Sequence, residues 1–172
     1  PPRLRRQRQM CIRDRNIDGI GSETIDLLYS EGLVKNIADL YELKKTDILP
    51  LERMAEKSAD NIIKGIEESK KIPFHKLLFA LGIRYVGETV AKKLVTHYMS
   101  MDALLKTNQK ELESVDEIGD KIAVSVLEFI QNENNIILIN RLKEYGLNME
   151  VSRKELEQSF NLLQGKQIVV SG

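Results

Sequence analysis

A four-part internal repeat constrains the fold of this 172-residue chain more than any other feature of its sequence. Four segments align on a central apolar residue, with centres spaced 32 to 34 residues apart. The next position is small in every copy, and the positions three before and five after the centre are apolar. Matches at several offsets indicate a true internal repeat. The centres, each with its small neighbour, are Ile20-Gly21, Met54-Ala55, Val86-Gly87 and Ile118-Gly119.

Each copy of the repeat predicts a helix, a tight turn and a second helix. We expect the small residue to let the backbone turn sharply and to leave it bare, because no bulky Cβ substituent stands in the way. The apolar centre would anchor the turn between the two helices. The residue five positions after the centre would lie where the helices cross closely. These crossing residues are Ile25, Ala59, Ala91 and Ala123.

Helical periodicity continues from Asn16 to about Glu150, so the body of the chain is predicted to be all-α. Gly32 and Gly146 follow the last periodic residues of two helices, as C′ glycines do, and Pro73 suits the first turn of another helix. Residues 151–160 are rich in charge and predict a linker. The β-branched run at residues 168–170 predicts a strand, which would need partners from a further domain.

A helix that starts at a bare turn presents unpaired N–H groups and the positive end of its dipole, which together favour an anion. Phosphate is the anion that occurs in long, evenly spaced arrays, so the repeat predicts binding to a nucleic-acid backbone. Contacts from backbone amides to phosphate carry no base information, and binding should be independent of sequence. The candidate DNA-binding residues are Gly19, Ile20, Gly21, Arg53, Ala55, Lys57, Arg84, Val86, Gly87, Thr89, Ile118, Gly119 and Lys121.

The charge balance, with 26 basic and 26 acidic residues, conceals an asymmetry. Residues 1–15 contain arginine at six positions and a single acid, so the remaining chain is mildly acidic. This basic leader is either an arm that binds nucleic acid or a segment foreign to the protein. The only cysteine, Cys11, excludes an internal disulfide and a four-thiolate zinc site within the chain.

The sequence gives little indication of catalysis or of a membrane. No apolar run approaches the roughly 20 residues of a membrane span. His75 and His97 lie in helical segments and suit packing or surface roles rather than catalysis or metal binding. Asp116 and Glu117 could suggest Mg²⁺, but at a turn that faces phosphate we expect them to tune the loop. A helical solenoid that binds protein is an alternative, which explains the period but not the small residue at each turn.

Three segments carry a resemblance to a known family: "NIDGIGSETIDLLYSEGLVKNIADLYEL", "LLFALGIRYVGETVAKKL" and "VDEIGDKIAVSVLEFI". They resemble the helix-hairpin-helix domain of bacterial NAD-dependent DNA ligases. The segment "LQGKQIVVSG" resembles the first strand of the BRCT domain that follows in that family. The resemblance implies four tandem helix-hairpin-helix motifs in one compact all-α domain at residues 16–150. A truncated α/β BRCT domain would then begin at residues 161–172.

In this family, an upstream domain transfers AMP from NAD to a lysine and then to the 5′-phosphate of a nick, which the 3′-hydroxyl seals. The parent would use NAD, Mg²⁺ and a structural Zn²⁺. This chain lacks the K-x-D-G motif and the four-cysteine module, so we expect no bound cofactor and no activity of its own. The resemblance implies a monomer that binds nicked double-stranded DNA in the bacterial cytoplasm, at the nucleoid. A stand-alone structure-specific DNA-binding module is the alternative.

By position, the hairpin tips of the family map to residues 19–21, 53–55, 85–87 and 117–119. Hairpin two departs from the pattern, because Arg53 and Ala55 stand where glycines are usual. Hairpin four carries Glu117 at the first glycine position. We therefore expect hairpins one, three and four to contribute more of the main-chain contacts, with hairpin two partly structural.

Overall fold

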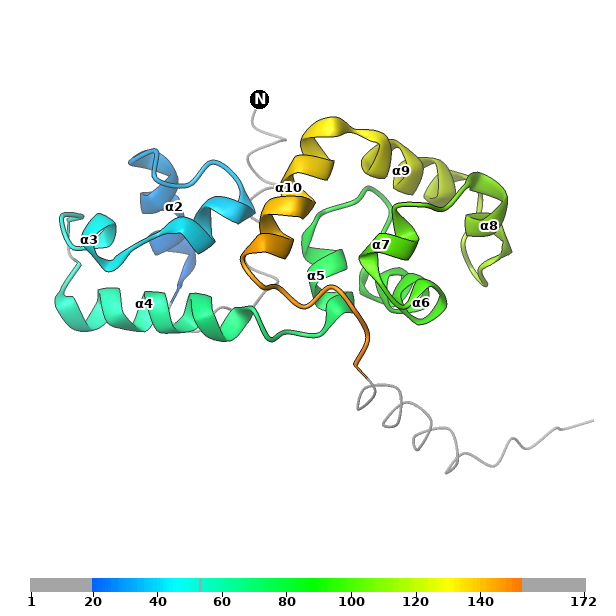
Figure 1. Ribbon diagram of the computed structural model, residues 1–172. Helices are drawn as coiled ribbons and strands as arrows, with labels where there is room; N and C mark the ends of the chain where they lie inside the picture. Colours follow the sequence, from blue (N-terminus) through cyan, green and yellow to red (C-terminus); the bar gives the residue numbers. More distant parts are fainter. Residues whose placement is uncertain (1–19, 53, 153–172) are drawn as a thin grey trace, which may run out of the picture.

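The computed structural model describes residues 20–52 and 54–152, and within them the regular elements are helices with one isolated antiparallel bridge between Ser100 and Glu150. Two groups of helices lie side by side, with α10 between them (Figure 1). The first group comprises α2 (Ser22–Ser30), η1 (Ile37–Glu42), α3 (Lys45–Ile48) and α4 (Glu56–Ser69). The second comprises α5 (Phe74–Ala80), α6 (Glu88–Tyr98), α7 (Met101–Leu104), α8 (Gln109–Ser114) and α9 (Asp120–Gln131), and α10 spans Glu133–Glu144.

The predicted all-α body is confirmed for this part of the chain. The basic leader at residues 1–15, most of the linker at 151–160 and the predicted strand at 161–172 lie outside the described residues, and these assignments stay predictions. Two elements differ from expectation. The segment at 37–42 is a 3₁₀ helix, and α3 is a four-residue helix that is too short to produce a recognisable period.

The repeat takes the form of helix pairs joined by tight turns. α3 packs on α4, α5 on α6, and α8 on α9. α2 begins with the same backbone geometry as α4, α6 and α9, but the segment that would pair with it lies outside the described residues.

Two of these helices end as the sequence predicts. Gly32 and Gly146 adopt left-handed backbone, with φ of +71° and +79°. In each case the N–H of the following leucine donates to a carbonyl five residues earlier, Leu33 to Leu28 at 3.0 Å and Leu147 to Leu142 at 3.2 Å. This arrangement is the Schellman motif, which satisfies the last carbonyls of α2 and α10.

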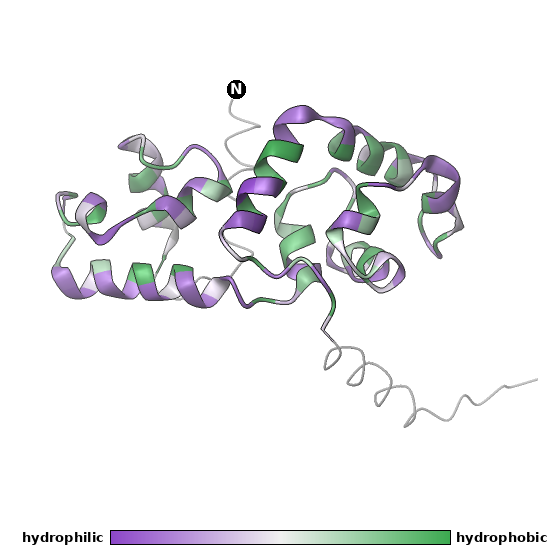
Figure 2. Ribbon diagram, in the orientation of Figure 1, coloured by the Kyte–Doolittle hydropathy of each residue, from purple (hydrophilic) through white to green (hydrophobic). Residues whose placement is uncertain are grey.

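A continuous apolar core runs through both groups of helices. Figure 2 shows hydrophobic and hydrophilic residues alternating along α4 and α9, as amphipathic helices require. The predicted crossing residues are all in this core: Ile25 is 3% exposed, while Ala59, Ala91 and Ala123 are fully buried. Any side chain longer than a methyl group at the three alanines would have to displace the neighbouring helix.

α10 joins the two groups of helices through an ionic cluster. The Arg141 guanidinium on α10 donates to Asp39 Oδ1 at 2.9 Å and to Glu42 Oε1 at 2.6 Å, both on η1. The Tyr145 hydroxyl also donates to Glu42, and its ring stacks on Tyr41. The boundary between the two helix groups, referred to below as the seam, is therefore held by contacts between residues about a hundred positions apart in the chain.

The segment after α10 continues this connection with backbone hydrogen bonds. Asn148 N–H donates to the Lys70 carbonyl, at the end of α4. Met101 N–H donates to the Met149 carbonyl, and Val151 N–H donates to the Met99 carbonyl. Residues 148–151 thus tie the end of one helix group to the connector between α6 and α7 in the other.

Candidate nucleic-acid interface

Four helices in the described residues start with nearly identical backbone. Their N-cap residues have φ between −75° and −84° and ψ near 180°, which is extended geometry. In each case the N-cap carbonyl accepts the first helical hydrogen bond from the buried crossing residue, at 2.9 to 3.1 Å. The four N-cap residues are Gly21, Ala55, Gly87 and Gly119. The repeat in the sequence is therefore a repeat in backbone conformation.

In the turns before α6 and α9, the sharp bend lies one residue before the apolar centre, not at the small residue as expected. Val86 N–H donates to the Ile83 carbonyl at 3.1 Å, which closes a four-residue turn, and Tyr85 within this turn has φ of +64°. The equivalent turn before α9 contains Glu117 with φ of +63°. The prediction that glycine at the N-cap makes the turn possible was wrong, since extended φ is open to any residue.

Ala55 adopts the same geometry as the three glycines, with φ of −82° and ψ of 159°. Ala55 therefore does not distort the start of α4, while Arg53, at the position equivalent to Tyr85 and Glu117, lies outside the described residues, so the expectation that hairpin two is partly structural stays a prediction. An added Cβ at Gly21, Gly87 or Gly119 would meet nothing within 4 Å. The fold therefore does not require a small residue at these positions. Because glycine has no side chain, the space in front of the helix start is open.

These helix starts also have open amide groups. No side chain in the described residues caps α2, α4, α6 or α9. α5 also lacks a side-chain acceptor, but it is only seven residues long, and at the start of the four-residue α3 the Asp47 carboxylate accepts from Lys44 N–H at 2.9 Å. By contrast, side-chain oxygens accept from first-turn amides in η1, α7, α8 and α10, at Asn36, Ser100, Asn108 and Asn132. The longer helices of the repeat therefore keep N–H donors and a positive dipole end available to an anion.

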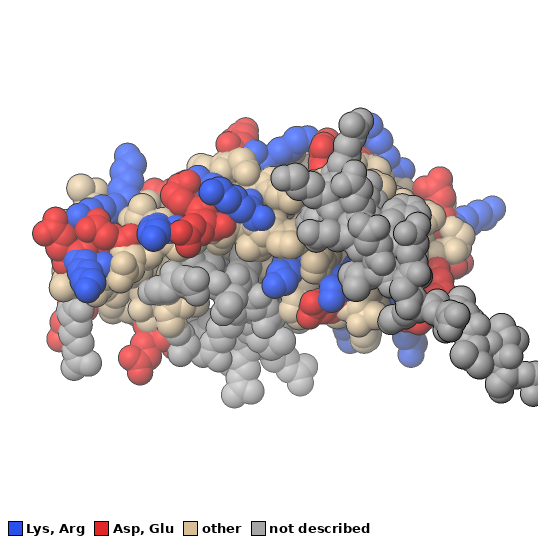
Figure 3. Space-filling model, turned by 90° about the horizontal axis from the view of Figure 1, so that it is seen from below, with Lys and Arg blue, Asp and Glu red and all other residues tan. Residues whose placement is uncertain are grey.

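Acidic residues beside these starts would repel an anion, but lysines pair with them. Lys45 contacts Glu56 at 3.1 Å at the start of α4, and Lys92 contacts Glu88 at 2.9 Å at the start of α6. The Lys92 hydrogen bond and charge hold the pKa of Glu88 below its usual range. Figure 3 shows lysine, arginine and acidic side chains interleaved on one face of the molecule, not separated into basic and acidic patches.

At the start of α9 the partner comes from a different helix pair. Lys93 Nζ, on α6, lies 2.9 Å from Asp116 Oδ2 and 2.8 Å from Glu117 Oε1. The hydrogen bonds to Glu117 and Asp116 raise the pKa of Lys93 above its ordinary value. Lys93 could not be found from the sequence, because nothing in the local pattern distinguishes it from the adjacent Lys92.

Some of the predicted site residues are buried or half-buried, and the others that the structure describes are exposed. Val86 and Ile118 are buried and Ile20 is half-buried, so their side chains pack into the core and mainly their backbone is available. The Arg84 guanidinium lies 4.8 Å from the centroid of the Tyr85 ring, which is 52% exposed. Gly19 and Arg53 lie outside the described residues. The exposed members of the predicted site are Gly21, Ala55, Lys57, Arg84, Gly87, Thr89, Gly119 and Lys121.

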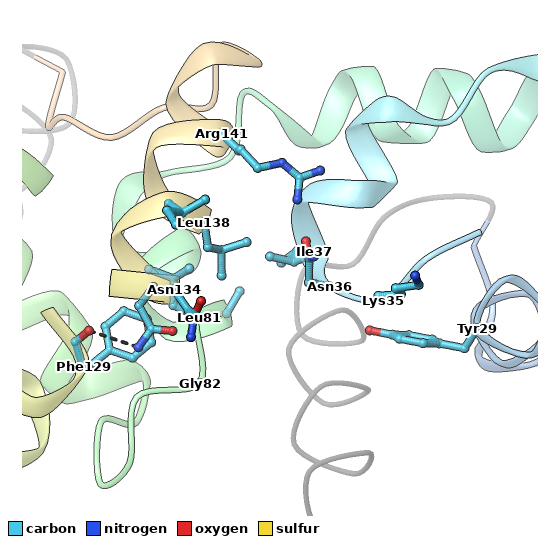
Figure 4. A pocket seen from close by; sticks show the side chains of 13 residues that line it. Tyr29, Lys35, Asn36, Ile37, Leu81, Gly82, Phe129, Asn134, Leu138 and Arg141 are labelled. Carbon is cyan, nitrogen blue, oxygen red and sulfur yellow. Dashed lines mark hydrogen bonds between the residues drawn. The ribbon is translucent and has the colours of Figure 1, made fainter. Parts of the chain in front are cut away.

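A pocket of about 540 Å³ lies on the seam between the helix groups, away from these helix starts. Its lining comes from α2, the loop before η1, the end of α5, α9 and α10, and includes Tyr29, Asn36, Leu81 and Arg141 (Figure 4). Within residues 20–52 and 54–152, no cluster of His, Cys, Asp and Glu could hold a metal ion. No described helix is long and apolar enough to cross a membrane.

Comparison with known proteins agrees with this geometry. Residues 76–139 match a family profile described as a helix-hairpin-helix motif. Residues 15–68 match one described as a SAM-like helix-hairpin-helix tandem. The two matches together cover the repeats, so the fold and the helix starts define this chain as a helix-hairpin-helix protein.

Relatives that match most or all of the chain identify a more specific family than the two motif profiles do. A DNA ligase of Christiangramia forsetii is 51% identical across the whole chain, which covers 26% of that protein. A DNA ligase of Flavobacterium psychrophilum is 57% identical over 91% of the chain, covering 24% of that protein. One of Phocaeicola vulgatus is 51% identical over the whole chain and 26% of its own length. The chain belongs to the helix-hairpin-helix region of the DNA ligase family, and it spans about a quarter of the length of these relatives.

Proposed function

We propose that this chain is the non-catalytic, duplex-binding part of an NAD-dependent DNA ligase, with four tandem hairpins that bind DNA phosphates through backbone amides. The observation that carries the proposal is the contrast between helix starts. The second helix of each repeat, α2, α4, α6 or α9, begins without a side-chain cap, while η1, α7, α8 and α10 begin with a side-chain acceptor. An N–H group left open at a helix start is a binding site for phosphate.

The open space at the N-cap glycines supports the same conclusion. A phosphate oxygen must come within about 3 Å of an amide nitrogen to accept a hydrogen bond. The absence of a side chain at Gly87 and Gly119 permits this approach, although the fold would accommodate a Cβ there. Exposed Lys57 and Lys121, each two residues after an N-cap, would add favourable charge beside the bound phosphate.

In this proposal, the parent protein seals nicks, and its other parts supply the chemistry with NAD, Mg²⁺ and a structural Zn²⁺. This chain contributes affinity for the nicked duplex, as a monomer in the bacterial cytoplasm. The chain alone should neither consume NAD nor seal a nick. It should bind duplexes of unrelated sequence equally well, because amide-to-phosphate contacts do not distinguish bases.

Fluorescence anisotropy with nicked duplexes of two unrelated sequences, over a range of salt concentrations, tests this proposal. We expect equal affinities and a log–log slope of about −0.9 for each phosphate neutralised. Preference for one sequence would contradict the amide mechanism. A lack of duplex affinity even at low salt would favour a protein-binding scaffold instead. Sealing by the purified chain would show that it is catalytic.

A further inference from the structure

The turn before α9 poses an electrostatic problem for a phosphate-binding site. Asp116 and Glu117 lie directly before Ile118 and Gly119, and both carboxylates are exposed, with side-chain exposures of 89% and 63%. Two negative charges a few ångströms from a bound phosphate would oppose its binding. The equivalent positions in the other copies of the repeat are Asp18-Gly19, Glu52-Arg53 and Arg84-Tyr85, so this is the one copy of the repeat in the sequence with acids at both positions.

Lys93 lies where it resolves this problem. Its ammonium group contacts both carboxylates, at 2.9 and 2.8 Å, although it belongs to α6 of the preceding helix pair. The Lys93 side chain is only 26% exposed, so it is more constrained than either partner. An ammonium group between two carboxylates offsets their charge and fixes their direction.

Lys93 also acts on a residue in left-handed backbone. Glu117, at φ of +63°, occupies a conformation that residues with a side chain rarely adopt. Its carboxylate is tied to α6, and through α6 to the helix that starts at Gly87. The same lysine therefore connects the helix starts of two neighbouring hairpins and sets one relative to the other.

We propose that Lys93 is a positioning residue for DNA binding, which draws Asp116 and Glu117 away from the phosphate and fixes the fourth hairpin against the third. This inference rests on the proposed function. Lys93 itself does not contact DNA in this arrangement. Its effect on affinity passes entirely through the two carboxylates, and removal of the carboxylates should abolish it.

Duplex affinity of the full chain, measured with a labelled nicked duplex at low salt, tests this arrangement. Lys93→Met should weaken binding by roughly fivefold to tenfold, because two carboxylates are uncovered near phosphate. Lys93→Arg should bind like the wild type, since a guanidinium can also contact both acids. Asp116→Asn/Glu117→Gln should bind more tightly than Lys93→Met, because no carboxylate remains to repel phosphate. Adding Lys93→Met to this double variant should change affinity by less than twofold.

Lys143→Met is the matched control, because Lys143 forms an exposed ion pair with Asp102 between α10 and α7, remote from the predicted tips in sequence. It removes the same charge and should leave affinity within about twofold of the wild type. Thermal unfolding of every variant separates lost affinity from lost fold, and the double variant tests the idea even if Lys93→Met unfolds.

Three outcomes would overturn the inference. If Lys93→Met weakens binding equally in the presence and absence of the carboxylates, Lys93 contacts phosphate directly. If Lys93→Met binds like the wild type, Lys93 positions nothing, while the proposed function stands. If the wild type fails to bind duplex DNA, both the proposed function and this inference fail.

Discussion

At the scale of single residues, the chain places its left-handed backbone at unexpected positions. Tyr85 and Glu117 take positive φ in the turns before α6 and α9, while the glycines that follow the apolar centres are extended. Glycine is therefore required for the fold at Gly32 and Gly146 but not at Gly87. At Gly87 the missing side chain leaves open space at the start of α6, which the proposed contact with phosphate would use.

Alanine substitutions should separate these two kinds of glycine by stability alone. Gly32→Ala and Gly146→Ala should each lower the free energy of unfolding by about 1 kcal/mol, because alanine is disfavoured at positive φ. Gly87→Ala should lie within about 0.5 kcal/mol of the wild type. At this position alanine stabilises the protein by reducing the entropy of the unfolded chain, and it destabilises the protein because it is a poorer N-cap than glycine. The two contributions to the free energy of unfolding are of similar size. Urea unfolding measures all three, and a loss above 1 kcal/mol for Gly87→Ala would show that the fold needs this glycine.

At the scale of helices, some N-termini have a side-chain cap and others do not. Adding a cap to one helix and removing it from another tests directly what the uncapped starts do. Gly119→Asn would place a side-chain acceptor at the start of α9, where the backbone is already extended. We expect a gain of a few tenths of a kcal/mol in stability. Duplex binding should weaken, because the new side chain competes for the amides and fills the open space.

Asn132→Ala is the counterpart at the start of α10, where the Asn132 side chain accepts from Asn134 N–H at 3.0 Å. This change should lower stability by about 1 kcal/mol and leave duplex affinity unchanged. Thermal unfolding should therefore shift in opposite directions in the two variants, while anisotropy should change for Gly119→Asn alone. Undiminished binding by Gly119→Asn would contradict the role assigned to the start of α9.

The sequence predicted the helices well where periodicity and capping residues agree. Gly32 and Gly146 mark helix ends through a backbone requirement that is local, so the sequence alone reveals it. The four-residue α3 is too short to show a period. The left-handed Tyr85 and Glu117 could not be anticipated, because side chains of their types usually avoid that conformation. Contacts such as Lys93 with Asp116 depend on how helix pairs pack, and no local pattern records them.

At the scale of the whole molecule, α10 and the segment after it hold the two helix groups together. Burial would raise the pKa of Asp39, but hydrogen bonds from Lys35 N–H, Arg141 and Asn36 N–H outweigh it and leave the pKa below its ordinary value. The hydrogen bond from Tyr145, followed by that from Arg141, likewise lowers the pKa of Glu42. Both carboxylates are thus more acidic folded than unfolded.

This cluster makes stability depend on pH in a defined direction. A carboxylate whose folded pKa is lowered contributes stability above its unfolded pKa and loses it as the pH falls through the folded value. We expect the free energy of unfolding to fall as the pH drops below about 4, the ordinary range of an aspartate. Asp39→Asn should reduce this acid sensitivity, and at neutral pH it should cost roughly 1–3 kcal/mol because Arg141 loses a charged partner. Thermal unfolding measured across pH gives the stability profile of each protein. Equal profiles for the variant and the wild type would exclude the cluster as a source of acid sensitivity.

Binding of DNA phosphates at the uncapped helix starts is tested most directly by NMR titration of the ¹⁵N-labelled chain with a nicked duplex. Backbone amides at the starts of α2, α4, α6 and α9 should shift first and furthest. Amides at the side-chain-capped starts of α7, α8 and α10 serve as controls within the same molecule and should stay in place. Large shifts at the seam pocket or along α10, with the four uncapped starts unchanged, would contradict the account.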